Sequence, residues 1–347
     1  MENKIRFAML GCGRIANAHF NALIEHKDRC ILTAVCDNEP EKAQEAADKY
    51  GATSFSDYDQ MLKAGGFDAV IITTPSGLHS SQTVKAAEHG YHVITEKPIA
   101  LTLDSADAMI DACDKAGKHL FVVKQNRLTT SMQRLYNAMD LGRFGKLYFA
   151  QVNVFWARPQ EYYDVAPWRG TWEHDGGAFM NQASHYIDLM CWLMGDADYV
   201  QAVTETLGRK IETEDTGSAV IKFKNGSIGS INVTMLTYPK NMEGSITILG
   251  EKGTVKIGGK ALTKIEQWQF ADYHDDDKLI EDTQGQLPDM ALSGHGNYYK
   301  NVLDVLSGSA EKPEIDGLSG RKAIELILAI NKASREGKSV SLPLNGD

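Results

Sequence analysis

The stretch that decides the fold is IRFAMLGCGRIA, residues 5–16. Its first six residues form a short apolar run, which is typical of a buried parallel strand. The run ends in a G-x-G-x-x-A turn made by Gly11, Gly13 and Ala16. In such a turn the first glycine permits the bend, the second lets the backbone approach a pyrophosphate, and the alanine lets the next helix lie close to the strand. The sequence therefore predicts a dinucleotide-binding turn.

An acidic residue follows the next expected strand, residues 31–36. This residue, Asp37, lies 21 positions after Ala16. A carboxylate at about this spacing accepts hydrogen bonds from the ribose 2′-hydroxyl of NAD. It would repel the 2′-phosphate of NADP by up to about 4 kcal/mol at an effective dielectric constant near 20. We therefore expect NAD as the cofactor, and the alternative is that Asp37 only caps the helix that Pro40 begins.

Strand and helix signals alternate as far as about residue 125. Further strands are expected at residues 69–74, 91–95 and 120–123, and helices at residues 40–50, 57–63, 79–89 and 104–116. Repeated β-α units of this length predict an α/β fold, a Rossmann domain whose doubly wound parallel sheet has helices on both faces. We place this NAD-binding domain at residues 1–125.

Two strand ends carry residues suited to chemistry, because ligands of such sheets bind at the carboxyl ends of the strands. Thr74 and Pro75, with His79 just beyond, follow one strand, and residues 96–98, Glu-Lys-Pro, follow the next. The proline keeps the backbone of Lys97 away from helical geometry. An ammonium group at this position can neutralise a developing alkoxide or pass on a proton.

These motifs, in this order and spacing, resemble the glucose–fructose oxidoreductase, inositol dehydrogenase and rhizopine-catabolism family of NAD(P)-dependent sugar oxidoreductases. The resemblance covers essentially the whole chain. It implies that Lys97 contacts both nicotinamide and substrate, and that the bond between residues 97 and 98 is often cis. We assign to the cofactor site Gly11, Gly13, Arg14, Ile15, Asp37, Thr74, Pro75, His79, Glu96, Lys97, Gln125, Trp168 and Arg169.

A second family signature lies at residues 176–189, where apolar residues recur at helical spacing and Gly195 is the expected stop. Asn181 and His185 are four residues apart, so we expect them on one helix face. His185 aligns with the catalytic histidine of the family, and Asn181 replaces its usual aspartate. An amide cannot act as a general base, so proton transfer falls to His185, Lys97 or both. Asn181 is expected to hold a substrate hydroxyl.

Residues 126–347 are expected to form an α+β domain for substrate binding and oligomerisation, with its C-terminal helices able to pack back on the first domain. A large, mostly antiparallel open sheet is predicted, because Lys-Asn-Gly at residues 224–226 and Glu-Lys-Gly at residues 251–253 are good turns. Strands are expected at residues 146–155, 200–206, 217–223, 226–235, 244–249 and 254–257, and helices at residues 129–141, 293–308 and 318–336. The helix of His185 is expected to lie against this sheet.

Basic and aromatic residues gather in loops of this domain. Arginine binds phosphate or carboxylate with two hydrogen bonds, and tyrosine or tryptophan stacks on a base or a sugar, so these loops suit an anionic substrate. We assign to the substrate site Lys97, Arg158, Tyr163, Asn181, His185, Tyr238 and Lys240.

The runs at residues 155–163, 168–172 and 238–241 are similar to one branch of the family, the bacterial UDP-N-acetylglucosamine 3-dehydrogenases. This resemblance implies oxidation of the 3-hydroxyl of UDP-N-acetylglucosaminuronate, or of UDP-N-acetylglucosamine, in the synthesis of surface lipopolysaccharide. It also implies a homo-oligomer, a dimer or tetramer, built through the outer face of the sheet. Two alternatives stay open: an inositol or free-sugar dehydrogenase, and a non-catalytic NAD-sensing regulator.

The composition limits the other partners. The 347 residues carry a formal charge of −10, which argues against nucleic acid or anionic membrane. Five irregularly spaced cysteines favour reduced thiols, and with no apolar run of the roughly 18 residues that span a bilayer we expect a cytoplasmic protein. We expect no metal, since residues 173–175 and 185–188 lack a compelling ligand spacing. The run His-Asp-Asp-Asp at residues 274–277 is expected to be a solvated loop.

Overall fold

The chain divides into two compact units. The computed structural model describes residues 4–259, 262–287 and 294–344. Of these, residues 4–125 and 294–321 form the first unit, and residues 126–259, 262–287 and 322–344 form the second. The segment 294–321 therefore returns to the first unit after the whole sheet of the second unit has been made.

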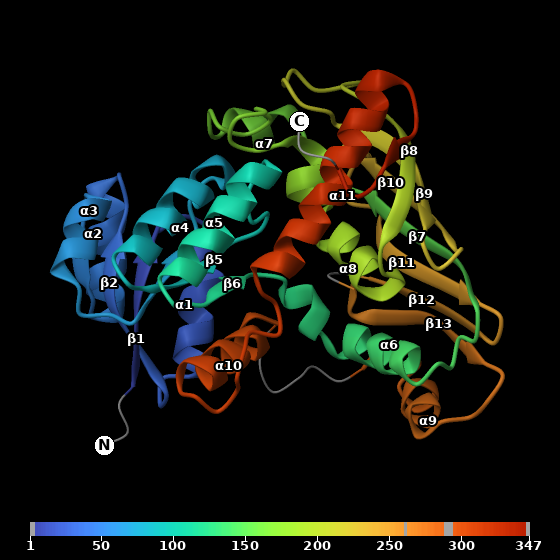
Figure 1. The fold of residues 1–347 in the computed structure, drawn as a ribbon, viewed down its shortest axis with the longest axis horizontal. Helices are drawn as coiled ribbons and strands as arrows, with labels where there is room; N and C mark the ends of the chain where they lie inside the picture. Colours follow the sequence, from blue (N-terminus) through green and yellow to red (C-terminus); the bar gives the residue numbers. More distant parts are fainter. Residues whose placement is uncertain (1–3, 260–261, 288–293, 345–347) are drawn as a thin grey trace. The chain divides into compact units, whose positions relative to one another are not determined.

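The first unit is built on a six-stranded sheet in the order β3-β2-β1-β4-β5-β6, in which all neighbouring strands pair in parallel (Figure 1). Its strands are β1 (Ile5–Leu10), β2 (Cys30–Cys36), β3 (Thr53–Phe55), β4 (Ala69–Ile72), β5 (His92–Thr95) and β6 (Leu120–Val122). The strand order reverses between β1 and β4, so the residues that follow these strands meet at the switch point where such sheets bind ligands. The predicted doubly wound Rossmann sheet is confirmed.

Helices cover this sheet and follow its strands. They are α1 (Ala16–Glu25), α2 (Pro40–Tyr50), α3 (Tyr58–Ala64), α4 (His79–Glu88), α5 (Leu103–Lys115) and α10 (Gly294–Leu306). The last of these comes from the returning segment and packs beside α1, the orange and blue helices of Figure 1. Nε2 of His26 lies 2.7 Å from the carbonyl oxygen of Gly296. The rings of Tyr299 and Phe7 meet edge to face, with their centroids 5.9 Å apart.

The second unit contains an eight-stranded sheet in the order β13-β12-β11-β7-β10-β9-β8-β14. Its strands are β7 (Leu147–Phe155), β8 (Ala197–Glu205), β9 (Thr216–Phe223), β10 (Ile228–Thr234), β11 (Glu243–Gly250), β12 (Gly253–Gly258), β13 (Lys264–Phe270) and β14 (Val340–Ser341). β10 pairs with β7 in parallel, whereas the other neighbours pair antiparallel. The mostly antiparallel sheet predicted from the sequence is confirmed.

The two faces of this sheet differ. One face carries fully buried side chains such as Val152, Ile221 and Ile231, and α8 (Ser184–Met194) packs against it on β7 and β11. The opposite face is more exposed. The further helices are α6 (Thr130–Asp140), α7 (Gln160–Asp164), α9 (Asp275–Asp282) and α11 (Gly317–Glu336), of which α11 begins in the first unit.

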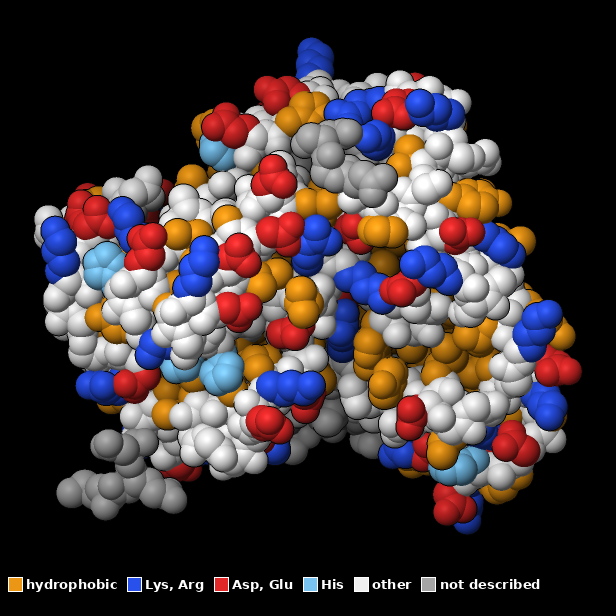
Figure 2. Space-filling model, in the orientation of Figure 1, with side chains coloured by type: hydrophobic (Ala, Val, Ile, Leu, Met, Phe, Trp, Pro, Cys, Tyr) orange, Lys and Arg blue, Asp and Glu red, His pale blue; other side chains and the backbone are white. Residues whose placement is uncertain are grey.

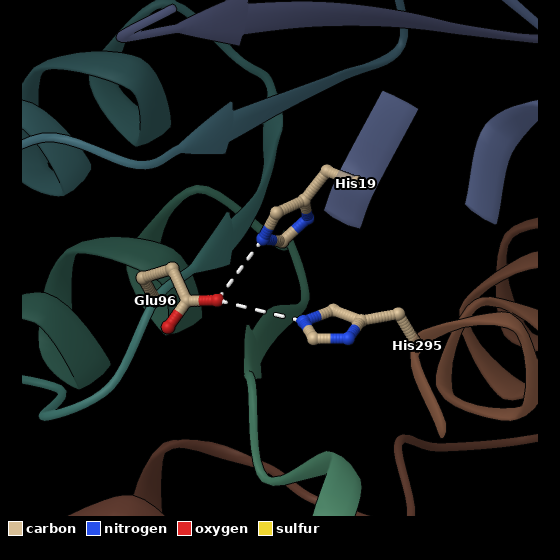
Figure 3. Close-up of side chains that lie close together, drawn as sticks. All are labelled: His19, Glu96 and His295. Atoms are coloured by element: carbon tan, nitrogen blue, oxygen red, sulfur yellow. Dashed lines mark hydrogen bonds and ion pairs between the residues drawn. The ribbon is translucent and has the colours of Figure 1, made fainter. Parts of the chain in front are cut away.

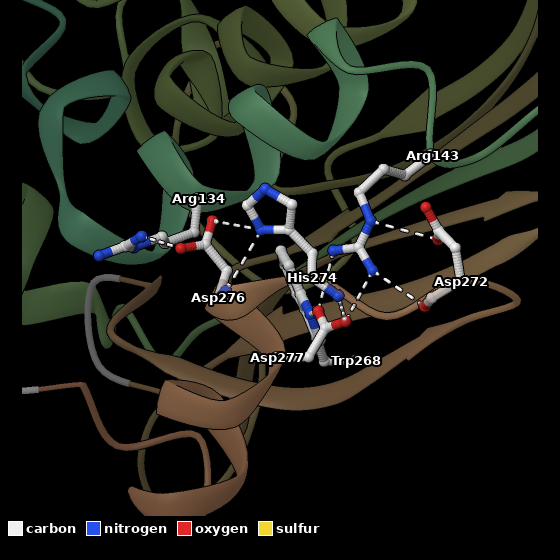
Figure 4. A network of polar contacts seen from close by, with 7 residues as sticks. All are labelled: Arg134, Arg143, Trp268, Asp272, His274, Asp276 and Asp277. Atoms are coloured by element: carbon white, nitrogen blue, oxygen red, sulfur yellow. Dashed lines mark hydrogen bonds and ion pairs between the residues drawn. The ribbon is translucent and has the colours of Figure 1, made fainter.

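The expected loop at residues 274–277 is wrong. His274 is the N-cap of α9, and Asp277 closes a capping box with it and is 7% exposed. Arg143 reaches Asp277 with two hydrogen bonds of 2.8 and 2.7 Å, and Trp268 donates to the same carboxylate at 2.6 Å (Figure 4). Arg134 pairs with Asp276 in the same network. The acidic run therefore fastens α9 to β13 and to the loop before β7, because a buried arginine needs a carboxylate partner.

Three properties of the described residues concern the surroundings of the molecule: the apolar length of its helices, its surface charge (Figure 2) and the pairing of its cysteines. No helix among the described residues has both the length and the apolar character needed to cross a bilayer. On the face drawn in Figure 2, acidic and basic side chains are interspersed. None of the five cysteines, all of which lie in the described residues, forms a disulfide.

Candidate active site

The glycine turn has the form that a bound pyrophosphate needs. Gly11 has φ +93°, and a Cβ there would lie 3.0–3.1 Å from atoms of Thr73, so the turn requires glycine. A Cβ on Gly13 would meet no described heavy atom within 4 Å, which leaves open space above the backbone. Within residues 4–259, no side chain caps the start of α1 at Ile15. The Ala16 and Ala18 N–H groups donate within the turn, to the carbonyl oxygens of Gly13 and Ile15, and the positive end of the helix dipole favours an anion here.

Asp37 is held against this turn. Its Oδ2 accepts a hydrogen bond from the Cys12 backbone N–H at 2.7 Å, and its Oδ1 accepts one from the Glu39 N–H at 2.9 Å. The N-cap of α2 is Glu39, so the carboxylate is not simply the cap of that helix. Asp37 joins the end of β2 to the fingerprint turn, the position from which a ribose is bound.

Loops after β4 and β5 are tied together by His79. This side chain is 1% exposed, and its Nδ1 and Nε2 lie 2.8 and 3.0 Å from the carbonyl oxygens of Pro98 and Thr74. Burial lowers the pKa of His79. The imidazole is thus buried between two backbone segments. Its contacts with the carbonyl oxygens of Thr74 and Pro98 hold the loop after β4 and the loop after β5 together.

Lys97 is half-buried and follows β5 directly. Its peptide bond to Pro98 is cis, as the resemblance implies. The backbone N–H of Lys97 donates to Glu96 Oε2 at 3.0 Å, and Glu96 Oε1 lies 3.0 Å from His19 Nε2 and 3.8 Å from His295 Nε2 (Figure 3). The sequence singled out neither histidine. His19, Glu96 and His295 each offer one atom that can bind a metal, and these three atoms lie within 4.8 Å of one another, so the group could hold a metal ion.

Gln125 begins the 3-10 turn after β6, in the first unit. Its neighbour Lys124 is 1% exposed. The predicted cofactor residues of the first domain, Gly11 to Gln125, therefore all follow the carboxyl ends of β1, β2, β4, β5 and β6, as the doubly wound topology requires.

In the second unit, the expected single helix around His185 is two elements. A π-helical turn, Ala178–Gln182, carries Asn181, and His185 lies in the first turn of α8. The i, i+4 geometry of one α-helix therefore does not apply to this pair. Such π-helical turns are frequent at functional sites. Gly195 ends α8, as predicted.

Two buried acids hold the π-helical turn. Asp175 accepts a hydrogen bond from the Asn181 side-chain amide and another from the Gly170 N–H at 2.9 Å. Glu214 accepts one from the Phe179 N–H at 3.0 Å. Burial raises the pKa of Glu214 to about 7. Sequence reasoning missed both acids, which lie in loops and acquire their role only through packing.

Guanidinium groups and aromatic rings alternate beside this turn. Arg158 lies 4.9 Å from the ring of Trp156 and 5.3 Å from that of Tyr162, while Arg169 lies 4.0 Å from Tyr162 and 5.3 Å from Trp168. We call these five residues the stacked ladder. Gln182, in the π-helical turn, accepts from Arg158 Nε at 3.0 Å and donates to the Tyr162 hydroxyl at 2.9 Å.

The remaining predicted substrate residues lie differently. Tyr163 is buried beside Gly170, and its neighbour Tyr162 takes the place between the two arginines. Tyr238 is 95% exposed, and Lys240 is exposed. In the same loop, Asn241 Oδ1 accepts from Arg158 Nη1 at 3.2 Å. Tyr162, Gln182 and Asn241 are therefore further candidates that the sequence did not identify, although each adjoins a predicted residue or run.

A doubly wound sheet with this glycine turn, Asp37 and Lys97, in a chain with a second unit built on an eight-stranded sheet, defines the class of NAD-dependent oxidoreductases. Comparison with family models agrees. Residues 5–124 match an oxidoreductase family with an NAD-binding Rossmann fold, and residues 132–256 match the GFO/IDH/MocA C-terminal domain. The chain belongs to the GFO/IDH/MocA oxidoreductase family, and its cofactor is NAD.

Solved structures and a curated relative extend the comparison. The WlbA dehydrogenase of Bordetella pertussis, in complex with NADH and UDP-GlcNAcA, is 50% identical, with 99% of this chain and 100% of that chain covered and a TM-score of 0.92. The WlbA dehydrogenase of Chromobacterium violaceum, with the same two ligands, is 52% identical, with coverage of 100% and 98% and a TM-score of 0.94. The myo-inositol 2-dehydrogenase of Thermotoga maritima is 26% identical over 97% of this chain and 98% of its own.

Proposed function

We propose that this protein oxidises the 3-hydroxyl of UDP-N-acetylglucosaminuronate to a 3-keto sugar nucleotide with NAD, and that UDP-N-acetylglucosamine is the alternative substrate of the same class. The observation that carries this proposal is the full-length likeness, at 50% and 52% identity, to two dehydrogenases solved with NADH and UDP-GlcNAcA. Relatives at this identity over the whole chain share far more than a fold.

The stacked ladder supports an anionic substrate. Stacking on aromatic rings fixes the plane of a guanidinium group, whose positive charge attracts phosphate or carboxylate. Arg158 and Arg169 are both stacked in this way, and Arg158 also donates through Nε and Nη1 to Gln182, Ala157 and Asn241. We propose that they bind the anionic groups of the sugar nucleotide, and that Tyr238 and Lys240 reach it from their exposed loop.

The proposed reaction uses Lys97 and His185. NAD accepts the hydride from the sugar carbon, and the chain must take the proton from the hydroxyl. Lys97 or His185 receives that proton, and Asn181, whose amide is held by Asp175, binds a substrate hydroxyl. A base lowers the barrier when its pKa is near the operating pH and it lies within hydrogen-bond distance of the proton. Holding the substrate and the cofactor in fixed positions supplies much of the remaining rate enhancement.

We also propose a cellular setting and an assembly. A 3-keto UDP-sugar suits a later transamination in the synthesis of surface lipopolysaccharide, and cysteines without disulfides suit the cytoplasm.

The exposed face of the eight-stranded sheet supports a homodimer or homotetramer. Strand pairing puts Tyr199, Val203, Val220 and Ile228 on this same face, at 41%, 66%, 54% and 44% exposure. Apolar side chains grouped on one exposed face mark an interaction surface.

A panel of substrates tests the function. Enzyme in amounts equal to NAD is mixed with UDP-N-acetylglucosaminuronate, UDP-N-acetylglucosamine, free sugars or inositols, and NADH absorbance is followed over one turnover, so that later re-oxidation does not hide the signal. We expect reduction with the uronate. Lys97→Met should abolish it while NAD affinity stays within about threefold, and the exposed Lys63→Met is the control.

The same panel separates the other candidates. Reduction by inositols or free sugars alone would replace the proposal with the activity named for the Thermotoga maritima relative. Binding of NAD without reduction by any sugar would point to a regulator. Near-normal turnover in Lys97→Met would remove that lysine from the mechanism.

A further inference from the structure

A carboxylate with a chain of hydrogen-bond partners directly precedes Lys97 in the sequence and binds its backbone N–H. Glu96 is 5% exposed, and His19 and Tyr299 are fully buried. Tyr299, on α10, places its hydroxyl 2.7 Å from His19 Nδ1, and His19, on α1, places Nε2 3.0 Å from Glu96 Oε1. Oε2 of the same carboxylate accepts the backbone N–H of Lys97 at 3.0 Å.

The chemistry of these groups fixes where the protons are. Burial would raise the pKa of Glu96, but the hydrogen bond from His19 and the nearby His295 hold it well below its usual value, so the carboxylate is ionised and can only accept. Burial lowers the pKa of His19, so its ring is neutral and carries one N–H. That hydrogen must be on Nε2, since it faces the carboxylate. Nδ1 is then an acceptor, and the Tyr299 hydroxyl donates to it.

We propose that Glu96, oriented by His19 and Tyr299, is a positioning residue that fixes the backbone of Lys97 and places a buried negative charge next to this lysine. This deepens the proposed function, because it rests on the role of Lys97 there. It also changes the expected role of Glu96: its carboxylate holds the lysine and the helix of the glycine turn rather than the cofactor itself.

Several ionisable groups face the carboxylate, and all belong to the first unit. They are His19 on α1, His79 on α4, His295, Tyr298 and Tyr299 on α10, and Lys97 after β5. Of these, Lys97 is the one proposed to take the substrate proton and so to become an ammonium group. Ionised Glu96 stabilises that ammonium group once it has formed.

Glu96→Gln separates charge from geometry. The glutamine oxygen can accept the Lys97 N–H while its amide donates to His19 Nε2, and His19 then carries its hydrogen on Nδ1 and donates to Tyr299. The contacts survive and the charge is lost. We expect kcat to fall about tenfold or more while the Kd for NAD stays within about threefold, because a lost charge–charge interaction acts on the lysine alone. Exposed Glu88→Gln is the matched control and should match wild type.

Two readouts do not depend on the sugar substrate. Lysines methylated with ¹³C are titrated by NMR, with the Lys97 signal assigned by its absence in Lys97→Arg, and Glu96→Gln should lower the Lys97 pKa by about one unit. ¹⁵N shifts of histidine should show His19 protonated on Nε2 in wild type and on Nδ1 in Glu96→Gln. If no UDP-sugar is oxidised, the proposed function fails, but these readouts still decide the role of Glu96.

Three results would overturn the proposal. A Kd for NAD that weakens as much as kcat falls would make Glu96 a cofactor ligand, and an unchanged Lys97 pKa with normal kcat would leave it a purely structural residue. Stoichiometric zinc in dialysed wild-type protein, lost in His295→Asn, would make the three residues of Figure 3 a metal site. Should Glu96→Gln fail to fold, Tyr299→Phe keeps the carboxylate and removes one donor. It should lower kcat about threefold, and a wild-type kcat there would equally contradict the proposal.

Discussion

Buried carboxylates in this protein accept hydrogen bonds from the backbone of the glycine turn, of Lys97 and of the π-helical turn. Asp37 accepts from the N–H of Cys12, Glu96 from that of Lys97, and Glu214 from that of Phe179. The sequence identified Asp37, Glu96 and Lys97 through motifs, because the dinucleotide-binding fingerprint and Glu-Lys-Pro have fixed spacing. It could not identify Glu214 or His19, because their role depends on packing between segments far apart in the chain.

Glu214 should make stability depend on pH. Its pKa rises from 4.5 in the unfolded chain to about 7 on burial, so the folded state binds the proton more tightly. The resulting stabilisation is complete below pH 4.5 and is lost as the pH rises through 7, and it amounts to on the order of 3 kcal/mol. Urea unfolding of Glu214→Gln between pH 5 and 8 should lack this part of the pH dependence. Exposed Glu212→Gln should retain it, and a wild-type pH dependence in Glu214→Gln would contradict the shift.

Elements with strong local signals were predictable, and elements set by distant contacts were not. Strand β4 is a continuous apolar run, and β1 is apolar and buried from Phe7 to Leu10, as burial on both faces requires. β3 has three residues, which is too few for a periodic pattern. The start of α9 was misread as a loop because its acids suggested solvent, whereas Asp277 turns inward to Arg143, 134 positions away.

The π-helical turn should be sensitive to one added methyl group. Gly177 has φ +96°, and a Cβ there would lie 2.2 Å from Glu214 Oε2. Gly177→Ala should therefore destabilise the protein by about 2–4 kcal/mol and raise the KM for the sugar, because it displaces the turn that carries Asn181. Gly226→Ala is the control, since it has φ +88° but open space, and should cost about 1 kcal/mol. Equal losses in both variants would show that backbone strain alone is responsible.

At the scale of the whole molecule, the sequence predicted both sheets, because each has a pattern of its own, whereas the return of residues 294–321 to the first unit has no such pattern. The sequence could not predict that Tyr162 lies between the two arginines or that Gln182 bonds to both Arg158 and Tyr162. Tyr162 and Tyr163 are equivalent in sequence until the backbone orients their rings. The sequence could predict that the sheet has one exposed face, because successive side chains of a strand point to opposite faces of the sheet.

Assembly through that face can be tested by charge. Val220→Glu puts a carboxylate at the centre of the exposed strands, and burying it in an interface would cost several kcal/mol, so the oligomer should dissociate. Light scattering after gel filtration measures the mass. Leu141→Glu, at a site 60% exposed at the end of α6, is the control and should keep the wild-type mass. An unchanged mass in Val220→Glu would place the interface elsewhere.

The return of α10 to the first unit has a consequence for how the protein is synthesised. His19 leaves the ribosome 280 residues before its partner Tyr299, which at 5–20 residues per second is roughly tens of seconds. Throughout that interval, the face of α1 that α10 covers is exposed in the nascent Rossmann unit. Glu96 and His19 also lack His295 and Tyr299, their partners on α10. Completion of the nucleotide-binding half is thus deferred until translation is nearly over, and fragments that stop at residue 125 should need chaperones or fail to stay folded.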